Sequence, residues 1–231
     1  MAAVGELIEH IPLSLDPEAV LRHLGGAGDS AAAGVRADIG RLRRRAREIV
    51  VPRAVYRLVA VEGITDGAVC LAGGQRFTSQ KLATLLVGAE TLAVMVGTIG
   101  EPLEAEVTRL FAASEYLDAL ALDAIGSVAV EEVCQHVRSL VCRQYADPGG
   151  LQVGPSLSPG YQYWDISDQA AVFALVPGSE IGVSLTESCL MVPRKSESAI
   201  VPLGRKLKVT AGEDEPPCRF CDHQDCPARV R

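Results

Sequence analysis

The chain has 231 residues, of which 48% are hydrophobic and 22% are charged, a composition typical of a globular protein with a sizeable core. Its formal net charge of −7 argues against a protein that binds nucleic acid through electrostatic attraction to phosphates. The most apolar window, 82–100, carries Glu90 in its middle and is broken by glycines, so we expect no membrane span. We see no basic start followed by an apolar run, so we expect no signal peptide and a cytoplasmic location.

The N-terminal half mixes helices with short strands. A helix is expected to begin at Asp16-Pro17, because aspartate is a favoured N-cap and proline a favoured first helical residue. The patterns that follow predict a basic helix, three short strands, a helix capped by Ser79 and a buried strand, over 37–49, 55–61, 69–72, 75–77, 79–86 and 91–98. The run Arg41–Arg47 is interpreted as the solvated face of the basic helix or, alternatively, as a docking patch for an acidic partner.

The C-terminal half contains the longest predicted helix, over 115–144, in which apolar residues recur every three or four positions. Ser114 is predicted to cap this helix, after a shorter helix that starts at Glu101-Pro102. A loop rich in proline and glycine leads to a helix capped by Ser167. Three more short strands are predicted over 181–185, 189–192 and 199–202.

The irregular mixture of helices and strands predicts an α+β fold, with a twisted, mostly antiparallel sheet and packed helices that include one long helix. We expect three parts: an N-terminal helix and loop (1–35), the α+β domain (36–208), and a linker with a cysteine-rich tail (209–231).

Three of the seven cysteines lie close together in the tail, as Cys218, Cys221 and Cys226. An odd count with four scattered members is a poor disulfide framework, so reduced thiols are expected. The two-residue gap lets two thiolates bind one metal from a tight turn, and three thiolates favour an iron–sulfur cluster, our first interpretation, or zinc. The fourth ligand stays open between His223, one of the isolated cysteines and an open site on iron; the competing interpretation is a reduced tail that binds nothing.

An aromatic loop is the second candidate site. Tyr161, Tyr163 and the only tryptophan, Trp164, lie within four residues of a chain with 4% aromatic residues. Gly160 removes a side chain, so that backbone can approach a ligand closely. The loop is suited to a flat ligand or a partner surface, and equally to capping the edge of a small sheet.

Several motifs together resemble the activation (reactivation) domain of cobalamin-dependent methionine synthase. They are Ser158-Pro-Gly-Tyr-x-x-Trp164 with Asp168-Gln169, Ile181-Gly-Val-x-Leu-Thr-Glu-Ser188, Met191-x-Pro-x-Lys-Ser196, the turn Thr98-Ile-Gly100, and Leu122-Asp-Ala-Ile-Gly-Ser-x-Ala-x-Glu131. Their order and spacing cover roughly residues 40–205. The resemblance implies a domain that binds S-adenosylmethionine and caps a corrinoid during the reductive methylation of cob(II)alamin.

Carried over by residue, the resemblance places Pro159, Gly160 and Tyr161 in the loop between the methyl donor and the corrinoid. Tyr161 is the candidate catalytic residue, and all three are candidate cofactor-binding residues together with Glu131.

The chain departs from the family pattern in three places. Ser156 stands where the family has an arginine, and Ser127 where it has an acidic residue on the long helix, with Glu131 and Glu132 as possible substitutes one turn later. The family's downstream tyrosine pair is absent. We therefore expect the protein to act on the corrinoid either with or without bound S-adenosylmethionine.

The resemblance and the tail together predict an accessory protein for corrinoid-dependent methyl transfer, which reductively activates an inactive cob(II) corrinoid protein. The implied partners are a corrinoid protein or cobalamin-dependent methyltransferase, which presents the cobalamin, and an electron donor. The alternative is a non-catalytic chaperone or adaptor for corrinoid proteins, stabilised by a zinc tail.

Overall fold

The computed structural model describes residues 5–25, 33–161 and 163–211. Its main sheet has seven strands in the order β4-β3-β2-β5-β9-β6, with β1 paired to β2, and every pairing is antiparallel. These strands are β1 (Glu6–Ile8), β2 (Arg53–Thr65), β3 (Ala68–Leu71), β4 (Arg76–Thr78), β5 (Thr91–Thr98), β6 (Gln152–Val153) and β9 (Ser196–Gly204). A separate two-stranded sheet pairs β7 (Ser184–Leu185) with β8 (Met191–Val192). The expected mostly antiparallel α+β fold is confirmed.

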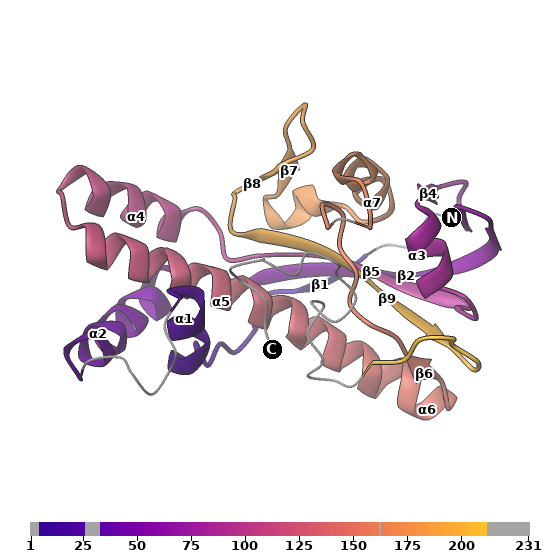
Figure 1. The fold of residues 1–231 in the computed structure, drawn as a ribbon, viewed down its shortest axis with the longest axis horizontal. Coiled ribbons are helices and arrows are strands. Elements are labelled where there is room, and N and C mark those ends of the chain that lie inside the picture. The colour runs from indigo at the N-terminus through magenta and orange to yellow at the C-terminus, as the bar shows by residue number, and fades with distance from the viewer. Residues whose placement is uncertain (1–4, 26–32, 162, 212–231) are drawn as a thin grey trace.

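Helices cover both faces of the sheet (Figure 1). They are α1 (Pro17–His23), α2 (Ala33–Ile49), α3 (Gln80–Leu85), α4 (Pro102–Ala112), α5 (Tyr116–Val141), α6 (Asp147–Gly149) and α7 (Gln169–Leu175). The single-turn elements are the π-helix Cys142–Ala146 and the 3₁₀ turns Ile166–Asp168 and Gly178–Ile181. None of the helices in the described ranges is long and apolar enough to cross a membrane.

The central strands β5 and β9 separate two hydrophobic cores. Because successive side chains of a strand point to opposite faces, Ala93 and Ala199 pack into one core while Val94 and Ile200 pack into the other. The first core lies under α1, α2, α4 and α5, and the second under α3, α7 and the aromatic loop. The expectation of a strand over 91–98 buried on both faces is confirmed.

Helix α5 runs across the first core and continues through the π-helix into α6, so the expected long helix is present. The predicted cap is wrong. Ser114 has a φ of +62°, and the helix starts after Glu115 without a side-chain cap. Leu117 also departs from the apolar pattern, since it is 83% exposed at the tip of the α4–α5 hairpin.

The helix cap predicted at Ser167 is wrong as well. Asp165 accepts a hydrogen bond from the Ser167 backbone N–H at 2.8 Å and so begins a 3₁₀ turn, from which α7 follows. In contrast, the caps predicted at Asp16 and Ser79 are confirmed. The Asp16 carboxylate accepts from the N–H groups at the start of α1, and the Ser79 hydroxyl accepts from the Leu82 N–H.

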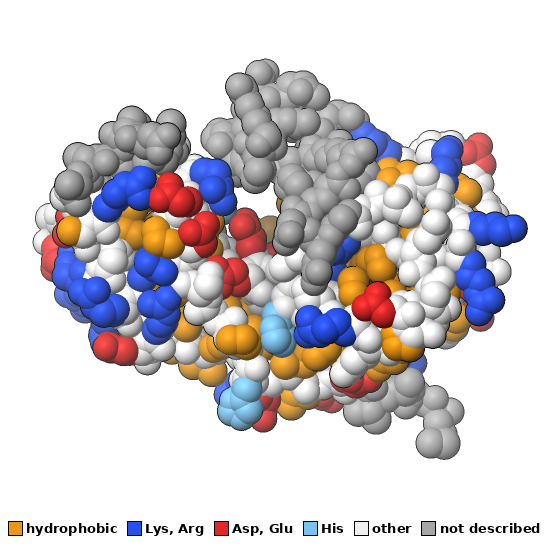
Figure 2. Space-filling model, turned by 90° about the horizontal axis from the view of Figure 1, so that it is seen from below, with side chains coloured by type: hydrophobic (Ala, Val, Ile, Leu, Met, Phe, Trp, Pro, Cys, Tyr) orange, Lys and Arg blue, Asp and Glu red, His pale blue; other side chains and the backbone are white. Residues whose placement is uncertain are grey.

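The arginines of α2 form a largely paired surface, on the left of Figure 2. The Arg41 guanidinium lies 2.7 Å from the Asp118 carboxylate, and Arg47 donates to the Ser14 carbonyl at 2.6 Å. The opposite side of the helix is buried, as predicted, through Ile39, Leu42 and Ala46. The solvated-face interpretation of Arg41–Arg47 therefore accounts for this helix.

Candidate functional site

The aromatic loop is a tight turn with glycine at its exposed corner. Gly160 has a φ of +92°, a conformation that side chains disfavour, and its N–H donates to the Trp164 carbonyl at 2.9 Å. The Trp164 N–H in turn donates to the Tyr161 carbonyl at 2.8 Å. Pro159 before the turn is buried, whereas Gly160 is exposed and Tyr161 half-buried. The turn therefore presents a short stretch of backbone with one aromatic ring beside it.

Trp164 anchors this turn in the second core. Its ring meets that of Phe77 edge-on, with centroids 4.8 Å apart. Its indole N–H donates to the Asp168 carboxylate at 2.8 Å, and the Thr78 N–H donates to the same oxygen at 2.8 Å. The Ser79 hydroxyl donates to the Tyr163 carbonyl, so the loop is tied to both β4 and the start of α3.

A hollow of about 470 Å³ opens beside the loop. The rings of Tyr161 and Tyr163 stack along it, with centroids 5.7 Å apart and an interplanar angle of 18°. The Lys81 ammonium lies 6.0 Å from the Tyr163 centroid. The other lining residues are Thr78, Ser79, Gly160, Trp164, Asp165 and Ile166. Because Tyr163 and Trp164 are buried, the surface offered to a ligand is the half-buried ring of Tyr161 and the exposed backbone of Gly160, among polar side chains. Such a surface can accept one edge or face of a flat ligand.

A second group of polar side chains lies on the other face of the sheet, between α5 and the start of β9. The Lys195 side chain is almost fully buried, and its ammonium lies 2.9 Å from the Ser127 hydroxyl and 3.0 Å from the Asp123 carboxylate. Its aliphatic stem passes over Gly126, where an added Cβ would lie only 3.3 Å from Lys195 Cε. The small pair Gly126-Ser127 thus makes room for a lysine of this same chain.

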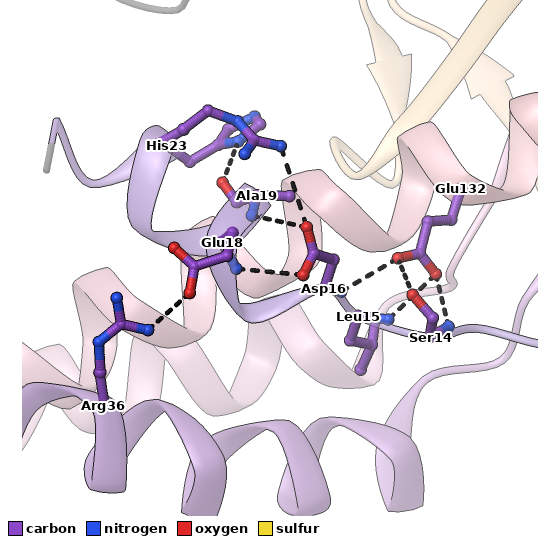
Figure 3. Close-up of polar contacts among 9 residues, drawn as sticks. Ser14, Leu15, Asp16, Glu18, Ala19, His23, Arg36 and Glu132 are labelled. Atoms are coloured by element: carbon purple, nitrogen blue, oxygen red, sulfur yellow. Dashed lines mark hydrogen bonds and ion pairs between the residues drawn. The ribbon is translucent and has the colours of Figure 1, made fainter. Parts of the chain in front are cut away.

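The acids that follow on α5 hold the N-terminal segment (Figure 3). The Glu132 carboxylate accepts hydrogen bonds from the backbone N–H groups of Ser14, Leu15 and Asp16, at 2.7, 3.1 and 3.3 Å, and from the Ser14 hydroxyl at 2.9 Å. Leu15 has a φ of +52°, which helps its neighbours' N–H groups to converge on one carboxylate. Glu132 thus has a structural role in securing the start of α1.

Glu131 pairs with α1 as well. Its carboxylate lies 3.1 Å from His23 Nε2, and the hydrogen bond from this partner raises the pKa of His23. The nearby Glu197 is partly buried beneath α5, and burial, followed by repulsion from Glu131, raises its pKa to about 8. Burial also raises the pKa of the Cys134 thiol, whose sulfur lies 4.0 Å from the Glu197 backbone oxygen. Cys134 is buried and Glu197 partly buried, whereas Glu131 and His23 are exposed, so this polar cluster runs from the interior to the surface of the protein.

The structure brings together some of the predicted site residues and separates others. Pro159, Gly160 and Tyr161 share one loop, whereas Glu131 lies on α5, which covers the opposite face of the sheet. The predicted metal ligands Cys218, Cys221 and Cys226 lie outside the described residues. Within 5–25, 33–161 and 163–211, no group of three or more His, Cys, Asp or Glu side chains could hold a metal.

Sequence reasoning missed the anchoring role of Asp168, which enters the sequence analysis only as part of the motif Asp168-Gln169. Its spacing of four from Trp164 is compatible with their hydrogen bond, but its contact with Thr78 joins segments 90 residues apart. The contact between Lys195 and Ser127 spans 68 residues, and no local pattern indicates it.

Comparison with known proteins supports the fold. No family model matches the chain, and no curated protein matches it. Among solved structures, it is similar to the crystal structure of the MetH reactivation domain bound to AdoHcy, with a TM-score of 0.64 and 17% sequence identity. The match covers 91% of this chain and 82% of that chain. The chain therefore has the fold of a reactivation domain.

Proposed function

We propose that this protein serves corrinoid-dependent methyl transfer, by docking onto a corrinoid protein and reactivating its cob(II) state. The observation that carries the proposal is the exposed Gly160 turn beside an aromatic hollow, in a chain with the fold of a reactivation domain. A corrin ring is broad and flat, so the exposed backbone turn at Gly160, next to the half-buried ring of Tyr161, offers it a complementary surface.

Reactivation needs one electron and one methyl group. The electron reduces cob(II)alamin to cob(I)alamin; the methyl of S-adenosylmethionine then passes to cobalt, as its S–C bond breaks and S-adenosylhomocysteine leaves. In our proposal Tyr161 and Gly160 cover the reacting face and exclude water, while the buried Pro159 fixes the turn. The tail cysteines would hold a redox-active iron–sulfur cluster that supplies the electron.

The polar cluster on α5 favours a second candidate function, a non-catalytic chaperone or adaptor for corrinoid proteins. Ser127 stands where the resemblance expects an acidic ligand for the methyl donor, and the Lys195 ammonium already binds it. Glu131, the predicted substitute, is paired with His23. In this function the tail would bind zinc, and the protein would bind the cob(II) form without transferring a methyl group.

Binding of the corrinoid can be tested with the fluorescence of Trp164, the only tryptophan. We expect saturable quenching when free cob(II)alamin is added without oxygen, and weaker binding by about tenfold or more in Tyr161→Ala, because a stacking platform is worth roughly 1–3 kcal/mol. Tyr116→Ala is the matched control, since this tyrosine is 57% exposed far from the hollow. Absence of quenching, or equal affinity in both variants, would contradict the proposal.

Calorimetry with S-adenosylmethionine separates the two functions. Binding of S-adenosylmethionine with micromolar affinity that is lost in Tyr161→Ala supports the catalytic function, reductive methylation of the corrinoid. No binding, in protein that still binds cob(II)alamin, supports the adaptor. The tail gives a further distinction: Cys221→Ser abolishes cob(II) reduction in the activator, but in the adaptor it lowers only thermal stability.

A further inference from the structure

The tip of the α4–α5 hairpin carries large apolar side chains that face solvent. Four of them, each between 41% and 83% exposed, form one group: Phe111 on α4, and Tyr116, Leu117 and Leu120 on α5. We call this group the hairpin surface. Leu120 follows Tyr116 by four positions and Leu117 by three, so these side chains are neighbours on the helix. The ring of Tyr116 also contacts that of Phe111, with centroids 6.3 Å apart, so the group is continuous across the two helices.

The connection between the two helices holds this surface in a fixed position. The Ser114 N–H donates to the Phe111 carbonyl at 3.0 Å, and the Glu115 N–H donates to the Leu110 carbonyl at 2.9 Å. On the inner side of the hairpin, Leu110 and Ala119 are buried in the first core. A surface that is ordered before it binds loses little conformational entropy when a partner docks.

The hairpin surface and the aromatic loop lie in different parts of the molecule. In Figure 1 the connection between α4 and α5 is at the far left, beyond the end of the sheet, whereas the aromatic loop precedes α7. A molecule that docks on the hairpin surface therefore leaves the hollow beside Gly160 open.

The charges that border the hairpin surface are paired within the chain. Four charged residues lie within three positions of it in the sequence: Arg109, Glu115, Asp118 and Asp123. The Arg109 guanidinium lies 2.9 Å from the Glu106 carboxylate and 3.8 Å from that of Glu115. Asp118 pairs with Arg41 at 2.7 Å, and Asp123 with Lys195 at 3.0 Å. A strongly charged partner would therefore have to compete with these pairs, whereas an apolar partner surface would not.

The size of the hairpin surface suits contact between two copies. A whole large side chain presents roughly 150–250 Å², so the exposed parts of these four come to roughly 350–550 Å² per copy. Apolar patches of this size on a monomer often mark interaction sites. With the small exposed side chains of Thr108 and Ala112 beside them on α4, two such surfaces would bury about 1,000 Å², the area at which specific interfaces begin.

We infer that the hairpin surface binds the hairpin surface of a second copy, so that the protein forms a two-fold symmetric dimer. In such a dimer the same residues meet across the axis, and a chain with a net charge of −7 tends to repel its own copy. The uncharged centre and the paired charges around it weaken this repulsion where the two copies meet. This dimer is independent of the proposed function, since neither the aromatic loop nor the tail takes part.

Sedimentation equilibrium of the full chain tests the dimer. We expect the wild type to dimerise with a Kd in the micromolar range, because the buried area is at the lower end for specific interfaces. Leu117→Glu should weaken dimerisation by about tenfold or more, since two carboxylates would be buried against each other. Leu190→Glu is the matched control and should behave as wild type, because it makes the same change at a leucine that is 58% exposed next to β8.

Mixing two variants tests the symmetry. Leu117→Glu and Leu117→Lys should each be largely monomeric, whereas an equimolar mixture should recover a dimer, because opposite charges then meet across the axis. Both variants should keep the circular dichroism spectrum of wild type, since Leu117 is largely exposed. A mixture that associates no better than either variant alone overturns the two-fold arrangement.

Other outcomes of these experiments also overturn the dimer. They are a wild type that stays monomeric at about 0.1 mM, well above a micromolar Kd, a dimer that Leu117→Glu leaves unchanged, and equal losses in Leu117→Glu and Leu190→Glu. A monomer that co-sediments with phosphatidylcholine vesicles, and loses this in Leu117→Glu, assigns the hairpin surface to a lipid surface instead. Quenching of Trp164 by cob(II)alamin reports on the aromatic hollow, so failure of the dimer and failure of the proposed function are distinguishable.

Discussion

Trp164 donates its indole N–H to the carboxylate of Asp168 at 2.8 Å, and the oxygen that accepts this bond also accepts the Thr78 N–H. One carboxylate oxygen thereby joins the aromatic loop, the start of α7 and the end of β4. The shape of the hollow depends on this connection, because Thr78 and Trp164 both line it.

Asp168→Ala should lower the free energy of unfolding by about 2 kcal/mol, because two donors lose a charged acceptor. Urea denaturation measures the loss. Asp165→Ala is the control: that aspartate is exposed and only caps a 3₁₀ turn, so a clearly smaller loss is expected. Equal losses in the two variants would contradict the anchoring role of Asp168.

Two glycine substitutions should change stability in opposite directions. At Gly97 an added Cβ would lie 2.7 Å from Val133 Cγ1 and 3.2 Å from Cys134 Sγ, so Gly97→Ala should destabilise the protein by about 1–3 kcal/mol. At Gly40, on α2, an added Cβ meets nothing within 4 Å, and Gly40→Ala should stabilise the protein by about 0.5–1 kcal/mol. Thermal unfolding of both variants compares them directly, and destabilisation by Gly40→Ala would count against the packing described for α2.

Glu197 should make the protein less stable as the pH rises. Its pKa is about 8 in the folded state against an ordinary value of 4.5, so the folded state holds the proton more tightly. The contribution to stability is therefore complete below about pH 4.5 and is lost as the pH rises toward 8. Glu197→Gln should retain more of its stability between pH 5 and pH 8 than wild type, as measured by urea denaturation at each pH.

His23 contributes a dependence of the same sign, because its pKa is also raised. Its stabilisation is complete below its ordinary value of 6.5 and is lost as the pH rises through the raised folded value. His23→Gln serves as the control, since it removes this contribution and keeps that of Glu197. If Glu197→Gln and wild type show the same slope, Glu197 is ionised in the folded protein and its described environment is wrong.

Glu132→Gln should loosen the attachment of the N-terminal segment. An amide keeps one oxygen acceptor but lacks the charge and the second oxygen, so we expect a loss of about 1–2 kcal/mol. Hydrogen exchange should show faster exchange of the Leu15 and Asp16 amides, whereas α5 stays protected. Glu48→Gln, on the exposed side of α2, should leave those amides unchanged, and equal protection in both variants would refute the role of Glu132.

Local signals in the sequence predict much of the fold. The Asp16-Pro17 start, the Ser79 cap and the buried strand over 91–98 each depend on neighbouring residues, and all three are confirmed. The caps at Ser114 and Ser167 failed because serine also favours turns. Ser114 adopts a left-handed conformation between α4 and α5, and Asp165 is the cap actually used.

The candidate site is predictable only in part, because its main contacts are long-range. The motif around Gly160 and Tyr161 identified the loop, but the hollow beside it also requires β4 and α3. Likewise, nothing near Ser127 in the sequence indicates that the Lys195 ammonium lies 2.9 Å from its hydroxyl, because this contact joins residues 68 positions apart.

Successive side chains of β9 point into different hydrophobic cores, so the register of β9 against β5 cannot shift without exchanging the two sets of side chains. Moving the strand by one position would turn Ile200 toward α5 and push Ala199 and Glu197 beneath the aromatic rings. A single-residue insertion or deletion in this strand would therefore damage both halves of the molecule at once, while substitutions that preserve the in–out order could be absorbed on one side alone.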